Sequence, residues 1–234
     1  MNFIKIPGKE FEMSIYQCTQ LEWQEHTGST PSHFKGSGNL PVEKVSWNDV
    51  QEFIKTINDK NDGYTYRLPT EEEWEFCCRA GNPGDYCFGD DVEQLNDYAW
   101  YWKNAESRTH PVGEKKPNAF GLFDMHGNVW EWCDDSWSPS SSSRVLRGGS
   151  WYTDASYTRS AFRYVSGPGD AYSIIGFRLV RTSRSSKTLL PSNSSDHMSL
   201  NEVKQRMWKS YRTKARREFL KLWNEAMAEE KKSV

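Results

Sequence analysis

The sequence predicts an α+β domain with short strands, few helices and much irregular structure, followed by a C-terminal helix. The stretch Asn118–Trp151 alternates glycines with tryptophans. Glycine allows positive φ or a close approach of two backbones, and tryptophan brings a large apolar face. This alternation favours a compact core of loops and short strands. Three helix-capping patterns lie before it, and the composition changes after residue 182.

The first hundred residues predict a hairpin and three short helices. Residues 3–13 are expected to form a β-hairpin, with Phe3 and Ile6 on one arm, Pro7-Gly8 at the turn, and Phe11 and Met13 on the other arm. Thr19, Ser46 and Thr70 are each followed three positions later by an acidic residue, which is the capping-box pattern at a helix N-terminus. The aromatic run at residues 98–102 is expected to belong to the core.

A strand is expected over residues 129–133, where the alternation has a period of two. This alternation places Trp130 and Trp132 on one face of the strand. Glu131 lies on the opposite face, between Val129 and Cys133. A buried carboxylate must be paired with a cationic group or bound to a metal. Glu131 is therefore a candidate for either arrangement.

Composition excludes several classes of protein. Hydrophobic residues make up 36% of the 234 residues and the mean hydropathy is -0.85, so no membrane span is expected. The net charge of -2 argues against nucleic-acid binding by the domain. Five cysteines indicate no disulfide framework and favour a reducing compartment or incidental buried thiols. No signal peptide is apparent, so the chain is expected to be cytoplasmic or a truncated form of an exported surface protein.

Three regions follow from these patterns. Residues 1–182 are expected to form the domain, residues 183–200 a serine-rich linker, and residues 201–234 a basic amphipathic helix. Such a helix can bind a partner, fold back on its own domain or self-associate.

Four motifs resemble the formylglycine-generating-enzyme/sulfatase-modifying-factor family. They are RLPTEEEWEF (67–76), GLFDMHGNVWEW (121–132), RVLRGGSW (144–151) and GFRLVR (176–181). The resemblance implies a C-type-lectin-like fold over most of residues 3–181. That fold hosts enzymes, degenerate enzymes and pure binding proteins, so the function must be argued from the site.

The resemblance also implies what an active enzyme needs. Formylglycine-generating enzymes use a cysteine pair shortly before the GFR motif, where soft thiolates bind copper. The last cysteine here is Cys133, and Ala155 and Ser160 stand near the expected pair. Without thiolates there is neither nucleophile nor copper ligand. Related iron enzymes need histidine ligands, and the five histidines here show no ligand spacing. We therefore expect no catalytic residues and no enzyme activity.

The family also implies a possible structural calcium ion. The matching ligands are the side chain of Asp124, the carbonyls of Gly127 and Val129, and the side chain of Glu131. Oxygen ligands around a glycine turn suit calcium. The alternative is that Glu131 pairs with Arg147 or Arg178 and that no ion binds.

Residues 152–175 have the composition of a binding surface. The segment lacks Lys, Glu, Gln, Met and Trp but is rich in Tyr, Ser and Gly, as antibody paratopes are. Outside the scaffold positions, each residue is reachable by randomising the adenines of an AAY codon. The segment thereby resembles the variable proteins of diversity-generating retroelements, which implies a ligand-binding role. The predicted ligand-binding residues are Tyr152, Thr153, Ser156, Tyr157, Thr158, Phe162, Tyr164, Val165, Ser166, Gly167, Gly169, Asp170, Tyr172, Ser173 and Ile174.

The ends of this segment are expected to leave and rejoin a sheet, with the GGSW and GFR strands paired. Arg159 and Arg163 are predicted to point inward, toward carbonyls or Glu131. An exposed set of Tyr and Phe side chains would then favour a protein ligand.

Three functions are compatible with the sequence. The first is a non-enzymatic protein that displays a diversified binding surface on a lectin-like scaffold. The second is a modifying-factor homologue with lost or altered metal-dependent oxidation, and the third is an adaptor that acts through its C-terminal helix.

Overall fold

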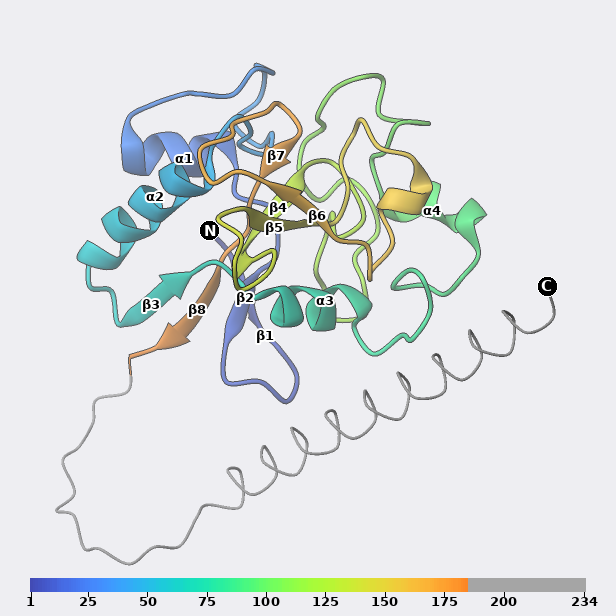
Figure 1. Ribbon diagram of the computed structural model, residues 1–234, viewed down its shortest axis with the longest axis horizontal. Helices are drawn as coiled ribbons and strands as arrows, with labels where there is room; N and C mark the ends of the chain where they lie inside the picture. Colours follow the sequence, from blue (N-terminus) through green and yellow to red (C-terminus); the bar gives the residue numbers. More distant parts are fainter. Residues whose placement is uncertain (185–234) are drawn as a thin grey trace, which may run out of the picture. The chain divides into compact units, whose positions relative to one another are not determined.

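The computed structural model describes residues 1–184; the predicted linker from residue 185 on and the predicted helix at 201–234 lie outside the described residues, and Ser183, where the linker was expected to start, is the last residue of a strand. The architecture is mixed α+β (Figure 1). The helices are α1 (Gln20–Thr27), α2 (Trp47–Asp59), α3 (Glu71–Arg79) and α4 (Leu95–Tyr98), with 3-10 turns η1 (Val92–Gln94) and η2 (Ala155–Tyr157). The strands are β1 (Phe3–Lys5), β2 (Glu12–Ser14), β3 (Tyr64–Arg67), β4 (Trp130–Ser136), β5 (Arg144–Arg147), β6 (Tyr164–Ser166), β7 (Ile175–Gly176) and β8 (Val180–Ser183).

The first three helices begin as the capping patterns predict. The side chains of Thr19, Ser46 and Thr70 each accept a hydrogen bond from the backbone of the third helical residue, whose acidic side chain bonds back to the cap. These reciprocal bonds satisfy amide groups that have no partner within the helix. The predicted hairpin is also confirmed, because β1 pairs antiparallel with β2.

The strands form two sheets, in the orders β1-β2-β8-β3 and β6-β5-β4-β7. In the second sheet, β4 pairs antiparallel with β5 and parallel with β7 (Figure 1). The expected pairing of the GGSW and GFR segments is therefore wrong, because β4 lies between their strands. The segment between β5 and β7, coloured yellow to orange in Figure 1, pairs with this sheet through β6 before it returns at β7.

The core is built on the two faces of β4. Trp130 and Trp132 belong to an apolar cluster with α2 residues such as Phe53, whereas Cys133 belongs to another cluster with Trp74 of α3. The predicted alternation of this strand is thus confirmed. The aromatic run at residues 98–102 is only partly buried: Tyr101 lies in the core, but Trp102 is 63% exposed.

The five cysteines are all free thiols. Within the described part of the chain, no helix combines the length and the apolar character that crossing a membrane requires.

Candidate ligand-binding surface

The end of the segment at residues 152–174 is held by two hydrogen bonds to its backbone carbonyls. Trp151 is buried, and its indole Nε1 donates a 3.0 Å hydrogen bond to the Ser173 carbonyl. The backbone N–H of Trp130 on β4 donates to the Ile174 carbonyl at 2.7 Å. Both donors lie outside the segment and both acceptors are carbonyls, so neither bond depends on a side chain of the segment.

Arg147, the last residue of β5, holds the middle of the segment. Its buried guanidinium donates to the three consecutive carbonyls of residues 160–162, at 2.7, 2.9 and 2.7 Å. Its charge is balanced by Glu75 of α3, whose Oε2 lies 2.5 Å from Nη2. A planar guanidinium with five N–H donors is suited to several acceptors at fixed positions.

His126, in the loop before β4, provides another anchor. Burial lowers the pKa of His126 from 6.5 to about 4, so the imidazole is neutral at physiological pH. Nε2 accepts a 3.1 Å bond from the Cys87 backbone N–H, which leaves Nδ1 as the donor to the Thr158 carbonyl at 2.8 Å. This anchor also reaches the segment through a carbonyl.

The loop between β6 and β7 is closed by a turn and docked on α2. The Asp170 carboxylate accepts bonds from the Ser166 hydroxyl at 2.6 Å and the Gly167 N–H at 2.7 Å, and these bonds lower the pKa of Asp170. Backbone N–H groups of Lys44 and Asn48 donate to the carbonyls of residues 172 and 168. Ser166 and Asp170, predicted as ligand contacts, thus also shape the loop.

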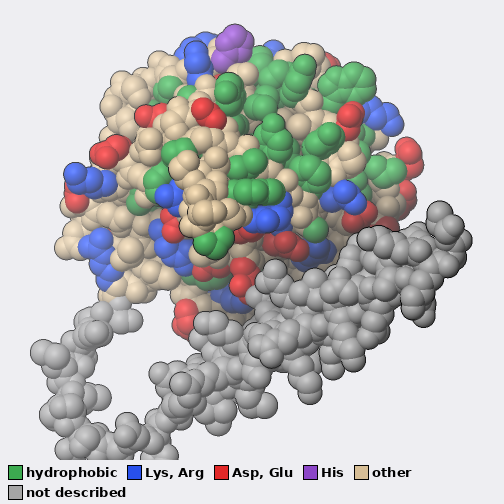
Figure 2. Space-filling model, viewed as in Figure 1, with side chains coloured by type: hydrophobic (Ala, Val, Ile, Leu, Met, Phe, Trp, Pro, Cys, Tyr) green, Lys and Arg blue, Asp and Glu red, His purple; other side chains and the backbone are tan. Residues whose placement is uncertain are grey.

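The tyrosines of the segment point to solvent. Tyr152, Tyr157, Tyr164 and Tyr172 are 63, 41, 46 and 54% exposed, and they are half of the eight exposed large hydrophobic side chains among residues 1–184. Figure 2, viewed as Figure 1, shows hydrophobic side chains gathered on the face over which the segment runs. Exposed apolar side chains that gather on one face often mark interaction sites in soluble proteins.

The other predicted contact residues differ in exposure. Ser156 and Gly169 are exposed, and Thr153, Val165, Ser166, Gly167, Asp170 and Ser173 are half-buried. Phe162 and Ile174 are half-buried and pack against the core cluster of β4. The predicted ligand contact at Thr158 is wrong, because this residue is fully buried. Its hydroxyl donates a 2.9 Å hydrogen bond to the Ala155 carbonyl. Thr158 packs inside the domain beneath the segment and is not part of the exposed surface of the segment.

The predicted inward orientation of Arg159 and Arg163 is also wrong. Both side chains are about 40% exposed, at 42% and 40%; Arg163 pairs with Glu71 of α3, and Arg159 lies 3.8 Å from Asp85. The inward cations are Arg147 and Arg178, which are fully buried. A spacing of four residues predicts a shared side of a helix, whereas Arg159 and Arg163 lie in irregular backbone between η2 and β6.

The residues implied for calcium surround the side chain of Gln17. Glu131 is buried and forms an ion pair with Arg178, with Nε–Oε2 and Nη2–Oε1 distances of 2.7 and 2.8 Å. The Gln17 amide Nε2 lies 3.1 and 3.0 Å from the carbonyl oxygens of Gly127 and Val129, and 2.9 Å from Glu131 Oε1. A calcium ion needs these oxygens at about 2.3–2.6 Å. The four residues therefore do not fit calcium while Gln17 occupies their centre.

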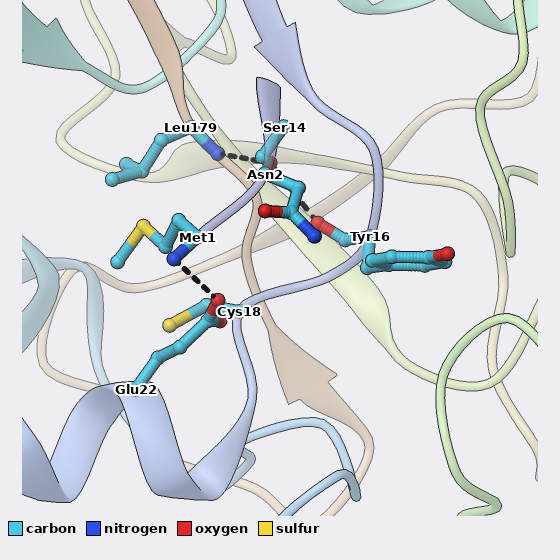
Figure 3. Close-up of a pocket in the computed structure, with 7 residues that line it drawn as sticks. All are labelled: Met1, Asn2, Ser14, Tyr16, Cys18, Glu22 and Leu179. Atoms are coloured by element: carbon cyan, nitrogen blue, oxygen red, sulfur yellow. Dashed lines mark hydrogen bonds and ion pairs between the residues drawn. The ribbon is translucent and has the colours of Figure 1, made fainter. Parts of the chain in front are cut away.

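Two pockets lie away from the segment. The pocket in Figure 3, beside the start of α1, has a volume of about 10 Å³ and is bordered by the Met1 N-terminus–Glu22 ion pair at 3.0 Å. The other pocket, lined by residues that include His26 and Arg181, measures about 120 Å³. Small-molecule sites usually occupy about 300–1,000 Å³. Both pockets are smaller than this range.

Trp102 lies beside this surface and was not predicted to do so. Its backbone N–H donates a 3.1 Å bond to the Thr153 carbonyl, and its side chain is the most exposed tryptophan of residues 1–184. Its position within an aromatic run indicated burial. Only the hydrogen bond to residue 153, 51 positions later in the chain, places Trp102 at the edge of the segment.

The comparisons with known proteins agree with this architecture. The sulfatase-modifying factor enzyme 1-like domain matches residues 2–183. The chain belongs to this family. Variable protein 1 of Treponema denticola superposes with a TM-score of 0.68 and 32% sequence identity, over 73% of this chain and 84% of that protein. The family and the C-type-lectin-like fold expected from the motifs are confirmed.

Curated relatives of this family member include enzymes and an inactive homologue. The formylglycine-generating enzyme of Streptomyces coelicolor is 32% identical over 186 residues, which cover 67% of this chain and 57% of the relative. The inactive C-alpha-formylglycine-generating enzyme 2 of Mus musculus is 35% identical over 172 residues, which cover 67% and 53%. The chain spans just over half the length of these two relatives.

Proposed function

We propose that this family member is a non-enzymatic binding protein that holds a protein ligand on the tyrosine-rich face of residues 152–174. The observation that carries the proposal is the way in which the segment is anchored. Arg147, His126 and Trp151 all bind its backbone carbonyls. The backbone path is therefore supported by residues outside the segment, while many of its side chains are left free to meet a ligand.

The exposed side chains favour a protein as the ligand. Tyrosine gives a large, rigid contact area at a low cost in conformational entropy, and aromatic residues dominate the energetics of protein interfaces. Tyr157 packs edge-on against Phe162 at a centroid distance of 4.9 Å, and Tyr164 stacks on Trp130 at 5.3 Å. Anchors that are already ordered lose little entropy on binding. Similarity to a protein named as variable also supports a diversified surface.

The properties of the five cysteines argue against a function that depends on thiol chemistry. Burial raises the pKa of Cys77 and of Cys87 to about 12, and it also raises the pKa values of Cys18, Cys78 and Cys133. Nucleophilic attack and copper binding require the thiolate. Ser160, which stands near the expected cysteine pair, is buried, and no cysteine follows Cys133. The similarity to formylglycine-generating enzymes keeps an altered oxidase activity as the second candidate.

The test uses the full chain as bait, in wild-type form and with Tyr152, Tyr157, Tyr164 and Tyr172 replaced by serine. A partner captured by the wild type is purified, and its Kd is measured for both forms. We expect two of the four tyrosines to act as anchors, so that the variant binds about 2–4 kcal/mol more weakly, a roughly 30- to 1,000-fold weaker Kd.

A matched control replaces exposed apolar residues elsewhere, Leu21→Ser with Val92→Ser, which are 48% and 42% exposed. This control is expected to bind as the wild type does. A partner whose affinity ignores all four tyrosines would show that the surface lies elsewhere.

A further inference from the structure

We infer that the side-chain amide of Gln17 takes the place of the structural calcium ion that the family implies, so that this domain closes its central loop without a metal. The loop runs over residues 124–129 and leads into β4. Gln17 reaches it from the chain between β2 and α1, more than a hundred residues earlier.

One nitrogen atom lies against three of the four groups implied for calcium and against the carbonyl of the fourth residue. Gln17 Nε2 lies 3.4, 3.1 and 3.0 Å from the carbonyl oxygens of residues 124, 127 and 129, and 2.9 Å from Glu131 Oε1. The side chain is almost fully buried, at 1% exposure. The opposite amide orientation would set Oε1 against four oxygens, so the donor nitrogen is the atom that belongs there.

Glu131 has no remaining acceptor site for a cation. Oε1 accepts from Gln17 Nε2 and from Arg178 Nη2, and Oε2 accepts from Arg178 Nε at 2.7 Å and from Trp74 Nε1 at 2.6 Å. A carboxylate offers about four lone-pair positions, and these four donors use them all. The Arg178 guanidinium already balances its charge inside the core, which is the role a divalent ion would have.

The Asp124 side chain is turned to another donor. Its Oδ2 accepts a 2.9 Å bond from the Gly113 backbone N–H, its Oδ1 is buried without a hydrogen-bond partner, and Gln17 contacts only its carbonyl. The side chain at this position therefore contributes to a neighbouring turn. With Asp124 directed elsewhere and Glu131 saturated, the neutral amide of Gln17 is sufficient to hold the loop.

The test measures the melting temperature of the full chain in EDTA and in excess calcium chloride, together with calcium titration calorimetry. The wild type is expected to melt at the same temperature in both buffers and to show no binding heat. Gln17→Glu keeps the size of the side chain but replaces the donor by a carboxylate. We expect this variant to melt at least about 5 °C lower in EDTA, to regain stability in calcium and to bind calcium.

Gln24→Glu is the matched control, because Gln24 is exposed on α1; its melting temperature should not respond to calcium. If Gln17→Glu does not fold in either buffer, Gln17→Ala decides the matter. This variant should melt below the wild type in EDTA and gain stability from calcium, which can enter the vacated space.

Two results would overturn the inference. A wild-type melting temperature that rises with calcium would mean that Gln17 acts as a ligand through Oε1. Variants of Gln17 that melt like the wild type in EDTA would mean that the amide does not hold the loop.

Discussion

The indole of Trp151 and the carbonyl of Ser173 are joined by a 3.0 Å hydrogen bond, although 22 positions separate them. This bond closes the candidate binding segment into a loop whose ends lie on a buried aromatic side chain. Phe34 packs edge-on against the same indole at 5.3 Å. The candidate binding segment therefore rests on a core residue and on the irregular chain between α1 and α2.

Replacing the four exposed tyrosines by serine is expected to leave the fold nearly unchanged. Exposed positions usually contribute within about 0.5 kcal/mol each, with somewhat more for Tyr164, which stacks on Trp130. Trp130→Ala, by contrast, empties a core position and should cost about 3–5 kcal/mol. Chemical unfolding of the two variants makes the comparison. If the tyrosine set is as damaging as the single tryptophan, the segment is structural.

Arg147→Lys should loosen the middle of the segment. A lysine ammonium cannot reach three carbonyls and Glu75 together, so the free energy of unfolding should fall by about 3 kcal/mol. Amide hydrogen exchange should rise around residues 158–164. Arg144→Lys is the control on the same strand, since Arg144 makes one hydrogen bond, to the Asp134 carbonyl, and a cation–π contact with Trp47. Equal effects of the two variants would contradict the anchoring role of Arg147.

Glu43 should make stability fall as pH rises. Its carboxylate is fully buried, and burial raises its pKa from 4.5 to about 7 despite a 2.8 Å bond from the Phe34 N–H. The folded state then binds the proton more tightly, so this contribution is complete below pH 4.5 and is lost as pH rises through 7.

Relative to Glu43→Gln, the wild type should lose up to about 3 kcal/mol across this window. Urea unfolding of both proteins at several pH values measures the difference. Glu10→Gln, at an exposed position, should follow the wild type at every pH. A constant difference between wild type and Glu43→Gln would show that Glu43 does not titrate in this range.

Formylglycine formation should be absent. The full chain is incubated with copper, oxygen and a cysteine-containing sulfatase peptide, and the peptide mass is followed. No loss of the cysteine thiol is expected, because the chain has no cysteine after Cys133. Aldehyde above the level of a reaction without protein would favour the oxidase function instead.

A chain that ends at Arg184 should fold by itself. The last strand, β8, lies between β2 and β3, and the Arg184 N–H donates to the Gly63 carbonyl at 2.7 Å. Thermal unfolding should remain cooperative, with a melting temperature close to that of the full chain. Loss of cooperativity would show that the residues after 184 contribute to the domain.

The features predicted from the sequence are those that depend on residues nearby in the sequence. The caps at Thr19, Ser46 and Thr70 need only a partner three residues away, and the alternation around Glu131 needs only five consecutive residues. These features were predicted because their physical causes are local. The family motifs added the fold.

Contacts between distant residues were not predictable in the same way. The bonds of Gln17 to the loop before β4 span 107 to 114 positions, and nothing near Gln17 indicates them. The inward orientation predicted for Arg159 and Arg163 is wrong because their spacing carries no information on depth. Thr158 likewise looked available for a ligand, because its buried neighbour His126 lies 32 positions away.

The carbonyl anchors also restrict how the segment can evolve. Arg147 and His126 bind carbonyls at fixed positions between residues 158 and 162, and Trp151 binds one at 173. A substitution leaves a carbonyl in place, whereas an inserted or deleted residue between the anchors moves every later carbonyl out of register. New specificities in this chain should therefore arise from codon replacement at constant loop length, unlike antibody loops, which also vary in length.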